Sequence, residues 1–549
     1  MNKVKEKILD KKELILICLS IVFILMLPFF DEDMLIGTDY EYHFTRIKSI
    51  QETLQEGVFP VKIHMNMANE YGYGTGFFYP NFFLYIPAFI CMMGVDFYIS
   101  YKIFIAIMLV LMFAISYKSF KTVLDDKNTS LIATILYMFS NCITLQLYER
   151  AALGEFLGLI FIPAVVAGMY DYTHKDFKNP WLLALGFFGA ISSHLITTLL
   201  CAIYAIIVLL INIKSTIKDG KKFIRLIITA VLVAMLTMSF WAPMFEQMSL
   251  AKYRFNEPWT SADMNVFGLY DLFTKHENSV GLLITLCLPL IILALFDKNI
   301  SKKTKRYIIE FIVLIVIMCS QWFWEITKPV TGMIQFKWRL LGIASVVICI
   351  GLANILREYC YKYEINLKAA TVIITMFAVI CFFYQNSELE FYREDMVTAK
   401  LYSFWNSLGG GREYLPLETD VGVLNKPERI VADDGTELPR LSNYGRFEFE
   451  KTNSEQNIMN PQLIYYYGYV ADITKEDGTV EPVELRKNEN GLVELVTEGK
   501  TGHVRIWYNG TKIQKISYLV TAIAAVLVLG LGVIKIIRNK NNLEKIWKK

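Results

Sequence analysis

The sequence predicts an α-helical, polytopic membrane protein of about twelve transmembrane helices, with a small β-rich domain before the last helix. Of its 549 residues, 54% are hydrophobic and only 19% are charged, whereas soluble domains carry about 25% charged residues. Long apolar runs recur along most of the chain. A polar stretch interrupts them between residues 386 and 513.

A backbone that crosses hydrocarbon must satisfy its own hydrogen bonds, so we interpret each long apolar run as a helix. The stretch 181–213 is too long for one span and short for two, and Ser192-Ser193-His194 in its middle predicts a break between two helices. The run 82–95 is short and bracketed by proline and glycine, which favours a juxtamembrane or re-entrant segment. The clear runs are 14–30, 97–117, 129–147, 152–170, 225–245, 280–296, 307–323, 338–356, 368–384 and 516–537.

The distribution of lysine and arginine predicts the orientation. With the N-terminus inside, every predicted cytoplasmic loop is basic, as the positive-inside rule requires. These loops are 118–128, 171–180, 214–224, 297–306, 357–367 and 538–549. Both termini are therefore expected in the cytoplasm of a bacterium. The loops 31–80 and 248–279 and the polar stretch are expected outside its cytoplasmic membrane.

The polar stretch has the pattern of antiparallel strands. Polar and apolar residues alternate over 446–450 and over 503–508. Asp477-Gly478 and Asn509-Gly510 are typical of tight turns. The predicted domains are a transmembrane module over 1–385, which includes the first outer loop with its juxtamembrane helices over 31–96, a β-rich domain over 386–513, and a last helix with a basic tail over 514–549.

Composition excludes several classes of protein. The net charge is only +3 and no basic stripe is interleaved with aromatic residues, so nucleic acid is not an expected partner. The nine cysteines all lie in or beside apolar segments and form no C-x-x-C pair, which excludes a disulfide framework and a thiolate metal site.

The richest polar segment, residues 37–47, follows the first apolar run. Thr38 and Glu41 have the spacing of a capping box and predict the start of a helix. On that helix Asp39, His43 and Arg46 share one face. The neighbouring face is apolar and consists of Tyr40, Phe44 and Ile47. Such a face is suited to lying on the membrane surface. The alternative is an amphipathic helix whose polar face simply meets water.

Further polar residues are expected at the same outer face. Arg150 and Glu155 lie in the hairpin between two spans, His194 at the predicted helix break, and Arg339 at the entrance to a later span. Taken singly, the arginines could be interfacial anchors and His194 a satisfied helix end. Together, they suit a reaction between a lipid-linked phosphate and a hydroxyl group, because arginine binds phosphate through a planar fork of donors and a carboxylate can accept the hydroxyl proton.

Several motifs occur in a characteristic order. They are Gly57-Val58-Phe59-Pro60-Val61-Lys62-Ile63, Tyr71-Gly72-Tyr73-Gly74, residues 78–87, Arg150-Ala151-Ala152-Leu153-Gly154-Glu155, Ser193-His194, Trp338-Arg339 and Glu413-Tyr414-Leu415-Pro416. This order resembles YfhO-type bacterial membrane proteins, which are grouped with the GT-C glycosyltransferases and of which some are tagged 6-pyruvoyl-tetrahydropterin synthase-related. The resemblance covers nearly the whole chain.

The resemblance implies inverting transfer of a sugar from a polyprenyl-phosphate donor to an acceptor outside the membrane, which would be a cell-envelope glycan, a teichoic acid or a protein. Asp39 matches the acidic catalytic position of the first outer loop, and Glu41 is a weaker candidate. Arg150 and Arg339 are expected to bind the donor phosphate, and His43, Arg46, Glu155 and His194 to support catalysis. A lid that stacks on the sugar is expected from Tyr71, Tyr73 and Tyr79.

Metal dependence stays open. Some members carry Asp-Asp or Asp-x-Asp in the first loop, whereas this chain has Asp39-Tyr40-Glu41, so no cofactor is certain and Mg²⁺ or Mn²⁺ remains an option. Pterin synthase chemistry needs clustered histidines for zinc. The six histidines here are dispersed over both predicted membrane faces, and we reject that chemistry.

Two other functions remain alternatives. A transporter or flippase for a lipid-linked glycan would need charges deep in the membrane, and here they cluster at the ends of spans, with Glu310 an exception. A non-catalytic scaffold or sensor would rely on the exported domain alone.

Overall fold

The computed structural model describes residues 11–31, 33–35, 37–256, 268–274, 278–387, 393–394, 408–425, 430–441 and 446–547. Parts of the predicted loop 248–279 and of the predicted domain 386–513, and His276, lie outside these residues. The chain forms two compact units. Unit 1 comprises Met1–Gln51, Pro80–Arg225 and Glu257–Gly411, and unit 2 comprises Glu52–Tyr79, Leu226–Asn256 and Arg412–Lys549. Segments of two predicted outer loops and a helix pair thus group with the C-terminal strands.

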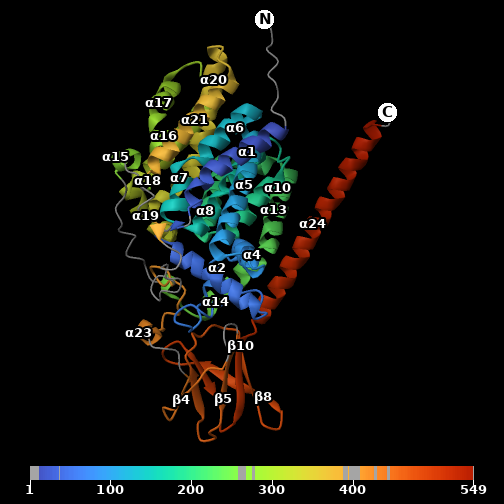
Figure 1. Cartoon of the computed structure of the whole chain (residues 1–549). Coiled ribbons are helices and arrows are strands. Elements are labelled where there is room, and N and C mark those ends of the chain that lie inside the picture. The colour runs from blue at the N-terminus through green and yellow to red at the C-terminus, as the bar shows by residue number, and fades with distance from the viewer. Residues whose placement is uncertain are drawn as a thin grey trace. The chain divides into compact units, whose positions relative to one another are not determined.

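Unit 1 is built from helices packed side by side (Figure 1), with α9 against α10, α5 against α6 and α9, and α20 against α6 and α18. Helix α20 lies at its centre, and nearly all of its first four turns are buried. The helices that begin in this unit are α1 (Lys11–Met26), η1 (Leu27–Phe29), α2 (Tyr40–Gln55), η2 (Phe82–Leu84), α4 (Tyr85–Met92), α5 (Phe97–Leu124), α6 (Lys127–Met138), α7 (Asn141–Thr144), η3 (Leu145–Glu149), α8 (Leu153–Leu159), α9 (Ile162–His174), α10 (Pro180–Ile191), α11 (Leu195–Ile211), α12 (Ile213–Lys218), α13 (Gly220–Leu236), α15 (Leu269–Thr274), α16 (Gly281–Leu286), α17 (Leu288–Phe296), α18 (Lys302–Cys319), α19 (Gln321–Thr331), η6 (Gly332–Ile334), η7 (Lys337–Leu340), α20 (Leu341–Lys362) and α21 (Leu367–Gln385). A two-residue strand, β1 (Met34–Leu35), pairs antiparallel with β2 (Arg393–Glu394).

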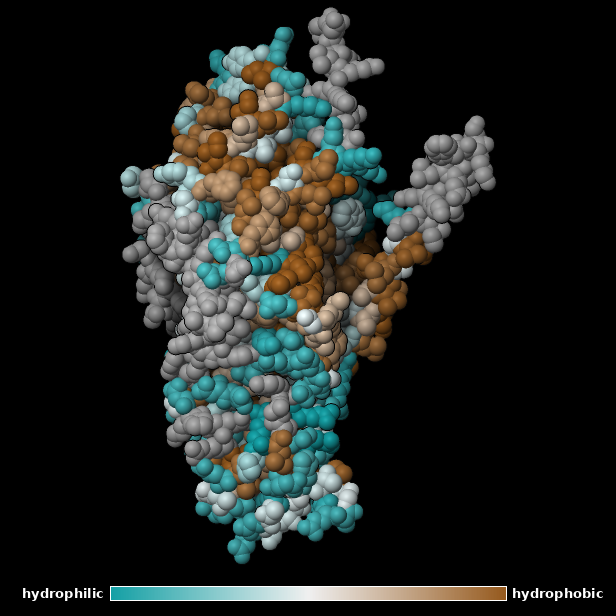
Figure 2. Space-filling view, viewed as in Figure 1, coloured by the Kyte–Doolittle hydropathy of each residue, from teal (hydrophilic) through white to brown (hydrophobic). Residues whose placement is uncertain are grey.

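Among the described residues, six helices are long and apolar enough to cross a membrane, or nine spans if each of three bent helix pairs counts as one. Four shorter apolar helices, Phe82–Met92, Pro180–Ile191, Leu195–Ile211 and Gly281–Phe296, accompany them. Figure 2 shows hydrophobic side chains gathered over the helices. The protein is a multi-pass membrane protein, and the predicted number of about twelve spans is not confirmed.

The predicted break in the stretch 181–213 is confirmed. Helix α10 ends at Ile191 and α11 begins at Leu195. His194 caps α11, because its Nδ1 accepts a hydrogen bond of 3.3 Å from the backbone N–H of Thr197. The run 82–95 forms only the short helices η2 and α4, as its proline and glycine residues predict.

Unit 2 contains the expected β-rich domain, an eight-stranded antiparallel sheet with the order β4-β3-β6-β9-β8-β7-β10-β5. The strands are β3 (Ile430–Ala432), β4 (Glu437–Leu438), β5 (Arg446–Lys451), β6 (Ile458–Pro461), β7 (Tyr469–Thr474), β8 (Val480–Lys487), β9 (Val493–Val496) and β10 (Gly502–Tyr508). The remaining elements are α3 (Thr75–Phe78), α14 (Met238–Leu250), η4 (Arg254–Asn256), α23 (Val421–Leu424) and α24 (Lys512–Trp547).

Both predicted strands of this domain are confirmed, and they pair with each other as β5 and β10. Asp477-Gly478 turns β7 into β8, with Gly478 at φ +82°. Asn509-Gly510 does not close a hairpin. It connects β10 to α24, and Gly510 at φ +72° allows the change of direction.

Candidate active site

The loop before α2 is fixed to the last residue of η3 and to the residue that follows it. The backbone N–H groups of Thr38 and Asp39 donate to the carbonyls of Glu149 (3.3 Å) and Arg150 (2.8 Å). Gly37 makes this approach possible, because a Cβ atom there would lie 2.6 Å from the carbonyl carbon of Arg150. Two segments more than 100 residues apart are therefore held together at Asp39.

Four of the predicted site residues form a chain of alternating charges within unit 1. The guanidinium of Arg150 lies between two carboxylates, with Nη2 at 3.3 Å from Oδ2 of Asp39 and Nη1 at 3.1 Å from Oε2 of Glu155. On its other side, Glu155 Oε1 lies 3.3 Å from Nε of Arg339. The structure thus brings Asp39, Arg150, Glu155 and Arg339 into direct contact, whereas the sequence placed them only at one membrane face.

Both arginines are held by a glutamine four residues earlier. Nη1 of Arg150 donates to Gln146 Oε1 at 3.0 Å, and Nη1 of Arg339 donates to Gln335 Oε1 at 2.9 Å. The indole ring of Trp338 lies beside both, 4.6 Å from the guanidinium carbon of Arg150 and 5.8 Å from that of Arg339. Hydrogen bonds and cation–π contacts therefore orient the two forks before any ligand arrives.

The sequence interpretation did not include Gln146 and Gln335. A glutamine stands four residues before each arginine in the sequence. Helical spacing does not mark the second pair, because Gln335 has φ +61° and lies between η6 and η7.

Helix α2 does not lie with its polar face in water. His43 and Arg46 are 3% and 1% exposed, and the apolar positions are buried as well. Nη2 of Arg46 donates to the carbonyl of Pro80 at 2.9 Å and to Oδ1 of Asn81 at 2.8 Å. The expectation of a surface helix on the membrane, and its alternative of a solvated polar face, are both wrong. The rule of one polar and one apolar face failed because neighbouring segments cover both.

The two histidines of the predicted site are neutral. Burial lowers the pKa of His43 well below its usual range, and the nearby positive charges of Arg46 and Arg150 lower it further. His194 shares a hydrogen bond of 2.9 Å between its Nδ1 and the hydroxyl of Thr197. The imidazoles can therefore accept or donate hydrogen bonds without adding positive charge to the arginines.

Asp39 is the acidic member that solvent reaches. Its side chain is 39% exposed, whereas that of Glu155 is 7% exposed. Partial burial raises the pKa of Asp39, and the charge of Arg150 opposes this rise. Glu41 is half-buried, and its Oε1 accepts a hydrogen bond of 3.3 Å from the hydroxyl of Tyr40. Asp39 thus combines access with a strengthened affinity for protons.

The predicted tyrosine lid differs from the structure. Tyr71 and Tyr73 are fully buried in unit 2. The hydroxyl of Tyr71 bonds to Oε1 of Gln462 (2.8 Å), and that of Tyr73 accepts from the backbone N–H of Tyr414 (3.1 Å). Tyr79 is half-buried with its ring edge toward Tyr414. Tyr71 and Tyr73 are core residues of unit 2, and a lid made of them would first have to leave that core.

The donor set around Asp39 does not suit a divalent cation. Both carboxylates of the charge chain are neutralised by Arg150 and Arg339, and these guanidinium groups repel a cation. Within the described parts of the chain, no three His, Cys, Asp or Glu side chains are grouped to hold a metal ion. We derive no step through Mg²⁺ or Mn²⁺.

A small cavity of about 10 Å³, room for one water molecule, borders Glu155 and Arg339 of the charge chain. Its polar lining includes Glu155, Arg339, Gln146 and Thr197, and the remaining lining is largely apolar.

Comparisons with known proteins give one family. Residues 14–361 match a family of unknown function, DUF6541. A protein of Lactococcus lactis subsp. cremoris (strain MG1363), "Uncharacterized protein", is 26% identical over 252 residues, which are 44% of this chain and 41% of the relative. The chain thus spans about two fifths of the length of that relative.

Two solved structures are similar at low identity. ArnT from Cupriavidus metallidurans, bound to undecaprenyl phosphate, has a TM-score of 0.41 and 14% identity over 63% of this chain and 60% of that one. The arabinofuranosyltransferase AftD from Mycobacteria has a TM-score of 0.44 and 11% identity over 70% of this chain and 27% of that one. The resemblance to YfhO-type proteins stays a prediction. By the match over 14–361, the chain belongs to the DUF6541 family.

Proposed function

We propose that this protein is a GT-C-type membrane glycosyltransferase, which moves a sugar from a polyprenyl-phosphate donor to an acceptor outside the bacterial cytoplasmic membrane. One observation carries the proposal. Two oriented arginines, Arg150 and Arg339, converge on Glu155, and the solvent-accessible carboxylate of Asp39 lies on the far side of Arg150. A binder of phosphate and a proton acceptor thus lie within one chain of contacts.

The arginines are suited to the phosphate of the donor. In the absence of donor, Glu155 lies between the two guanidinium groups and, together with Asp39, balances their charge. A phosphate on the carrier lipid would take over part of that role, and Trp338 would keep both forks in place. The negative charge that grows on the leaving phosphate is stabilised in the same way.

Asp39 would serve as the general base. It accepts the proton of the acceptor hydroxyl while the hydroxyl oxygen forms a bond to the anomeric carbon of the sugar. The bond from that carbon to the phosphate oxygen breaks on the opposite side, and the electron pair leaves with the polyprenyl phosphate. A single displacement of this kind inverts the anomeric centre, and no nucleotide or metal is required for its atom balance.

The orientation completes the proposal. With both termini in the cytoplasm, the loop that carries Asp39 and the β-rich domain face outward, where a glycan, teichoic acid or exported protein would supply the hydroxyl group. His43, Arg46 and His194 would position Asp39 and the sugar. The activated glycosyl phosphate bond of the lipid donor supplies the driving force.

The proposal is tested by transfer from a defined donor. Full-length protein in nanodiscs would be given undecaprenyl-phosphate-linked glucose, galactose and N-acetylglucosamine, each radiolabelled in the sugar, with bacterial cell-wall fragments as acceptor. We expect label to pass from the lipid to the acceptor with at least one donor, and to stay in the lipid when Arg150 and Arg339 are both alanine.

A flippase gives a different result with the same donors when the protein is reconstituted in sealed vesicles. It would move labelled donor from the inner to the outer leaflet of a sealed vesicle without releasing the sugar from its lipid. Translocation without transfer, in a protein whose circular dichroism spectrum shows it folded, would contradict the proposed function and favour the transporter.

A further inference from the structure

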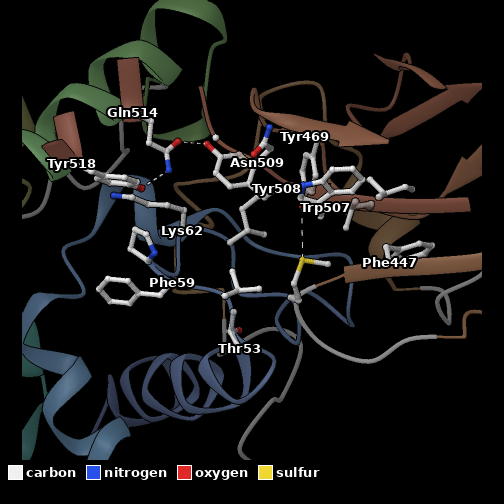
Figure 3. Close-up of a pocket in the computed structure, with 17 residues that line it drawn as sticks. Thr53, Phe59, Lys62, Phe447, Tyr469, Trp507, Tyr508, Asn509, Gln514 and Tyr518 are labelled. Atoms are coloured by element: carbon white, nitrogen blue, oxygen red, sulfur yellow. Dashed lines mark hydrogen bonds between the residues drawn. The ribbon is translucent and has the colours of Figure 1, made fainter. Parts of the chain in front are cut away.

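Unit 2 contains a second pocket, which the charge chain does not use. It is a cavity of about 100 Å³ lined by several polar and several aromatic side chains from four parts of the unit. Figure 3 shows them: Thr53 from the end of α2, Phe59 and Lys62 from the loop after it, Phe447 from β5, Tyr469, Trp507 and Tyr508 from β7 and β10, and Gln514 and Tyr518 from α24. The volume admits a phosphate or carboxylate group with some adjoining atoms.

The unusual residue of this pocket is Lys62. It is only 7% exposed, and its ammonium group donates to the backbone carbonyl of Ser239 at 3.1 Å. The rings of Phe240 and Tyr518 lie at 6.0 Å. In the described part of the chain, no carboxylate lies within ion-pair distance of it.

An ammonium group has three N–H donors, and the structure uses one. A charged lysine with two unsatisfied donors in a buried site is costly unless a ligand satisfies them.

A second polar group in the pocket also has no use in the fold. Thr53 is 2% exposed, and across the described residues its hydroxyl has no hydrogen-bond partner. The neighbouring amide of Gln514, by contrast, is engaged by the hydroxyl groups of Tyr508 and Tyr518. The unused donors of Lys62 and the unused hydroxyl of Thr53 therefore line the same cavity.

We propose that this pocket binds the anionic group of an acidic saccharide, a sugar residue that carries a carboxylate or phosphate. Lys62 would pair with the anion and Thr53 would donate to it. Several aromatic residues line the pocket, and aromatic rings are surfaces on which the apolar faces of sugar rings pack. Lys515, which donates to the pocket residue Asn509 at 3.2 Å, adds a second positive charge at the rim.

The charge of Lys62 depends on pH near neutrality, because burial lowers its pKa to about 7. The other titratable groups that line the pocket are Tyr469, Tyr508 and Tyr518, which are neutral below about pH 10. Glu246 on α14 bonds to the hydroxyl of Thr511. A bound anion favours the protonated amine, so binding is strongest below pH 7 and weakens above it.

The test is calorimetric titration of the full-length protein in phosphatidylcholine nanodiscs with D-glucuronate and with neutral D-glucose. A carboxylate probe keeps its charge between pH 6 and 8. At pH 6 we expect glucuronate to bind about tenfold more tightly than glucose, and at pH 8 about tenfold more weakly than at pH 6, since the protonated fraction of an amine with a pKa of about 7 falls by that factor. Equal affinity for the two sugars, or no binding of either, would overturn the proposal.

Two variants assign the effect to the pocket. Lys62→Met should abolish the preference for glucuronate, while Lys487→Met, at an exposed ion pair of the same unit, should leave it unchanged. If Lys62→Met does not fold, Thr53→Val keeps the shape of the side chain and should weaken glucuronate binding severalfold. A preference that survives both pocket variants refutes the assignment.

Phosphatidylglycerol nanodiscs separate the two sources of an anion. If the lipid headgroup competes fully with glucuronate, or inorganic phosphate binds while glucuronate does not, the pocket does not take an acidic saccharide. The proposal does not rest on sugar transfer by the charge chain, because this titration measures binding alone.

Discussion

Replacement of Asp39 by asparagine separates catalysis from structure. The amide keeps the size of the carboxylate and cannot accept the hydroxyl proton. Its structural cost should be small, because Asp39 makes one ion pair at 3.3 Å with a side chain that is 39% exposed, and such pairs contribute about 0–1 kcal/mol. Arg150 keeps its contacts to Glu155 and Gln146. We therefore expect normal folding and normal donor binding.

The rate of sugar transfer should fall by about 10²–10⁴-fold, the usual contribution of a general base. The measurement is a single-turnover assay with saturating lipid-linked donor, so that binding does not enter the rate. Glu41→Gln is the matched control, two residues away in the first turn of α2, and should change the rate far less.

The dependence of the rate on pH gives an independent readout. A protonated Asp39 cannot act as a base, so the parent should lose activity as the pH falls through its pKa. Burial raises this pKa, which places the acidic limb above the usual value of about 3.9. Asp39→Asn should remove that limb. A variant that transfers at the parental rate with the parental pH profile would refute the assignment of Asp39 as the base.

Three further predictions concern the donor site, the loop contact and the topology. Arg339→Lys keeps the charge and loses the bidentate fork, so the apparent KM for the lipid donor should rise, with a smaller fall in kcat. Steady-state kinetics would show both changes, and an unchanged KM and kcat would make Arg339 an anchor only. Gly37→Ala should lower the free energy of unfolding by about 1–3 kcal/mol in thermal denaturation, because the added Cβ would lie 2.6 Å from the backbone carbon of Arg150. The control is Gly332→Ala, whose Cβ would meet nothing within 4 Å and which should leave the free energy of unfolding unchanged. In a cysteine-free background, a single cysteine at Lys500 should react with an impermeant maleimide in intact cells and one at Lys303 should not; the reverse labelling would invert the proposed topology.

The sequence predicted what depends on local pattern. The helix break at Ser192-Ser193-His194 and strands β5 and β10 follow from spans of polar and apolar residues, and all were found. Such features need no knowledge of distant contacts, because the solvent or lipid around each segment selects the pattern.

What the sequence could not predict depends on long-range packing. Arg46 looked like part of a polar face in water, yet Pro80 and Asn81 cover it. Tyr71 and Tyr73 lie in a segment rich in glycine and aromatic residues, which is typical of mobile loops. Both are instead core residues, because partners more than 300 residues away complete their hydrogen bonds.

The candidate site shows both cases. Its residues were predicted as one group from the positive-inside rule, which places segments at a membrane face but gives no contacts within that face. The contact itself requires Gly37, whose lack of a side chain lets the first loop reach the backbone at Arg150. No pattern of hydrophobicity or charge marks such a glycine.

Glu155 explains why so much charge can be buried without a ligand. Two guanidinium groups in one low-dielectric site repel each other, and a single carboxylate between them at 3.1 and 3.3 Å compensates for that repulsion. This arrangement adds little to the free energy of folding, because well-packed apolar residues of similar volume often stabilise a fold as much as a buried ion pair does. The arrangement does keep two anion-binding forks rigid and ready, with one carboxylate that an incoming phosphate can partly replace. That property is what a donor site for a lipid-linked phosphate requires, and it is the physical reason to look for chemistry beside Asp39.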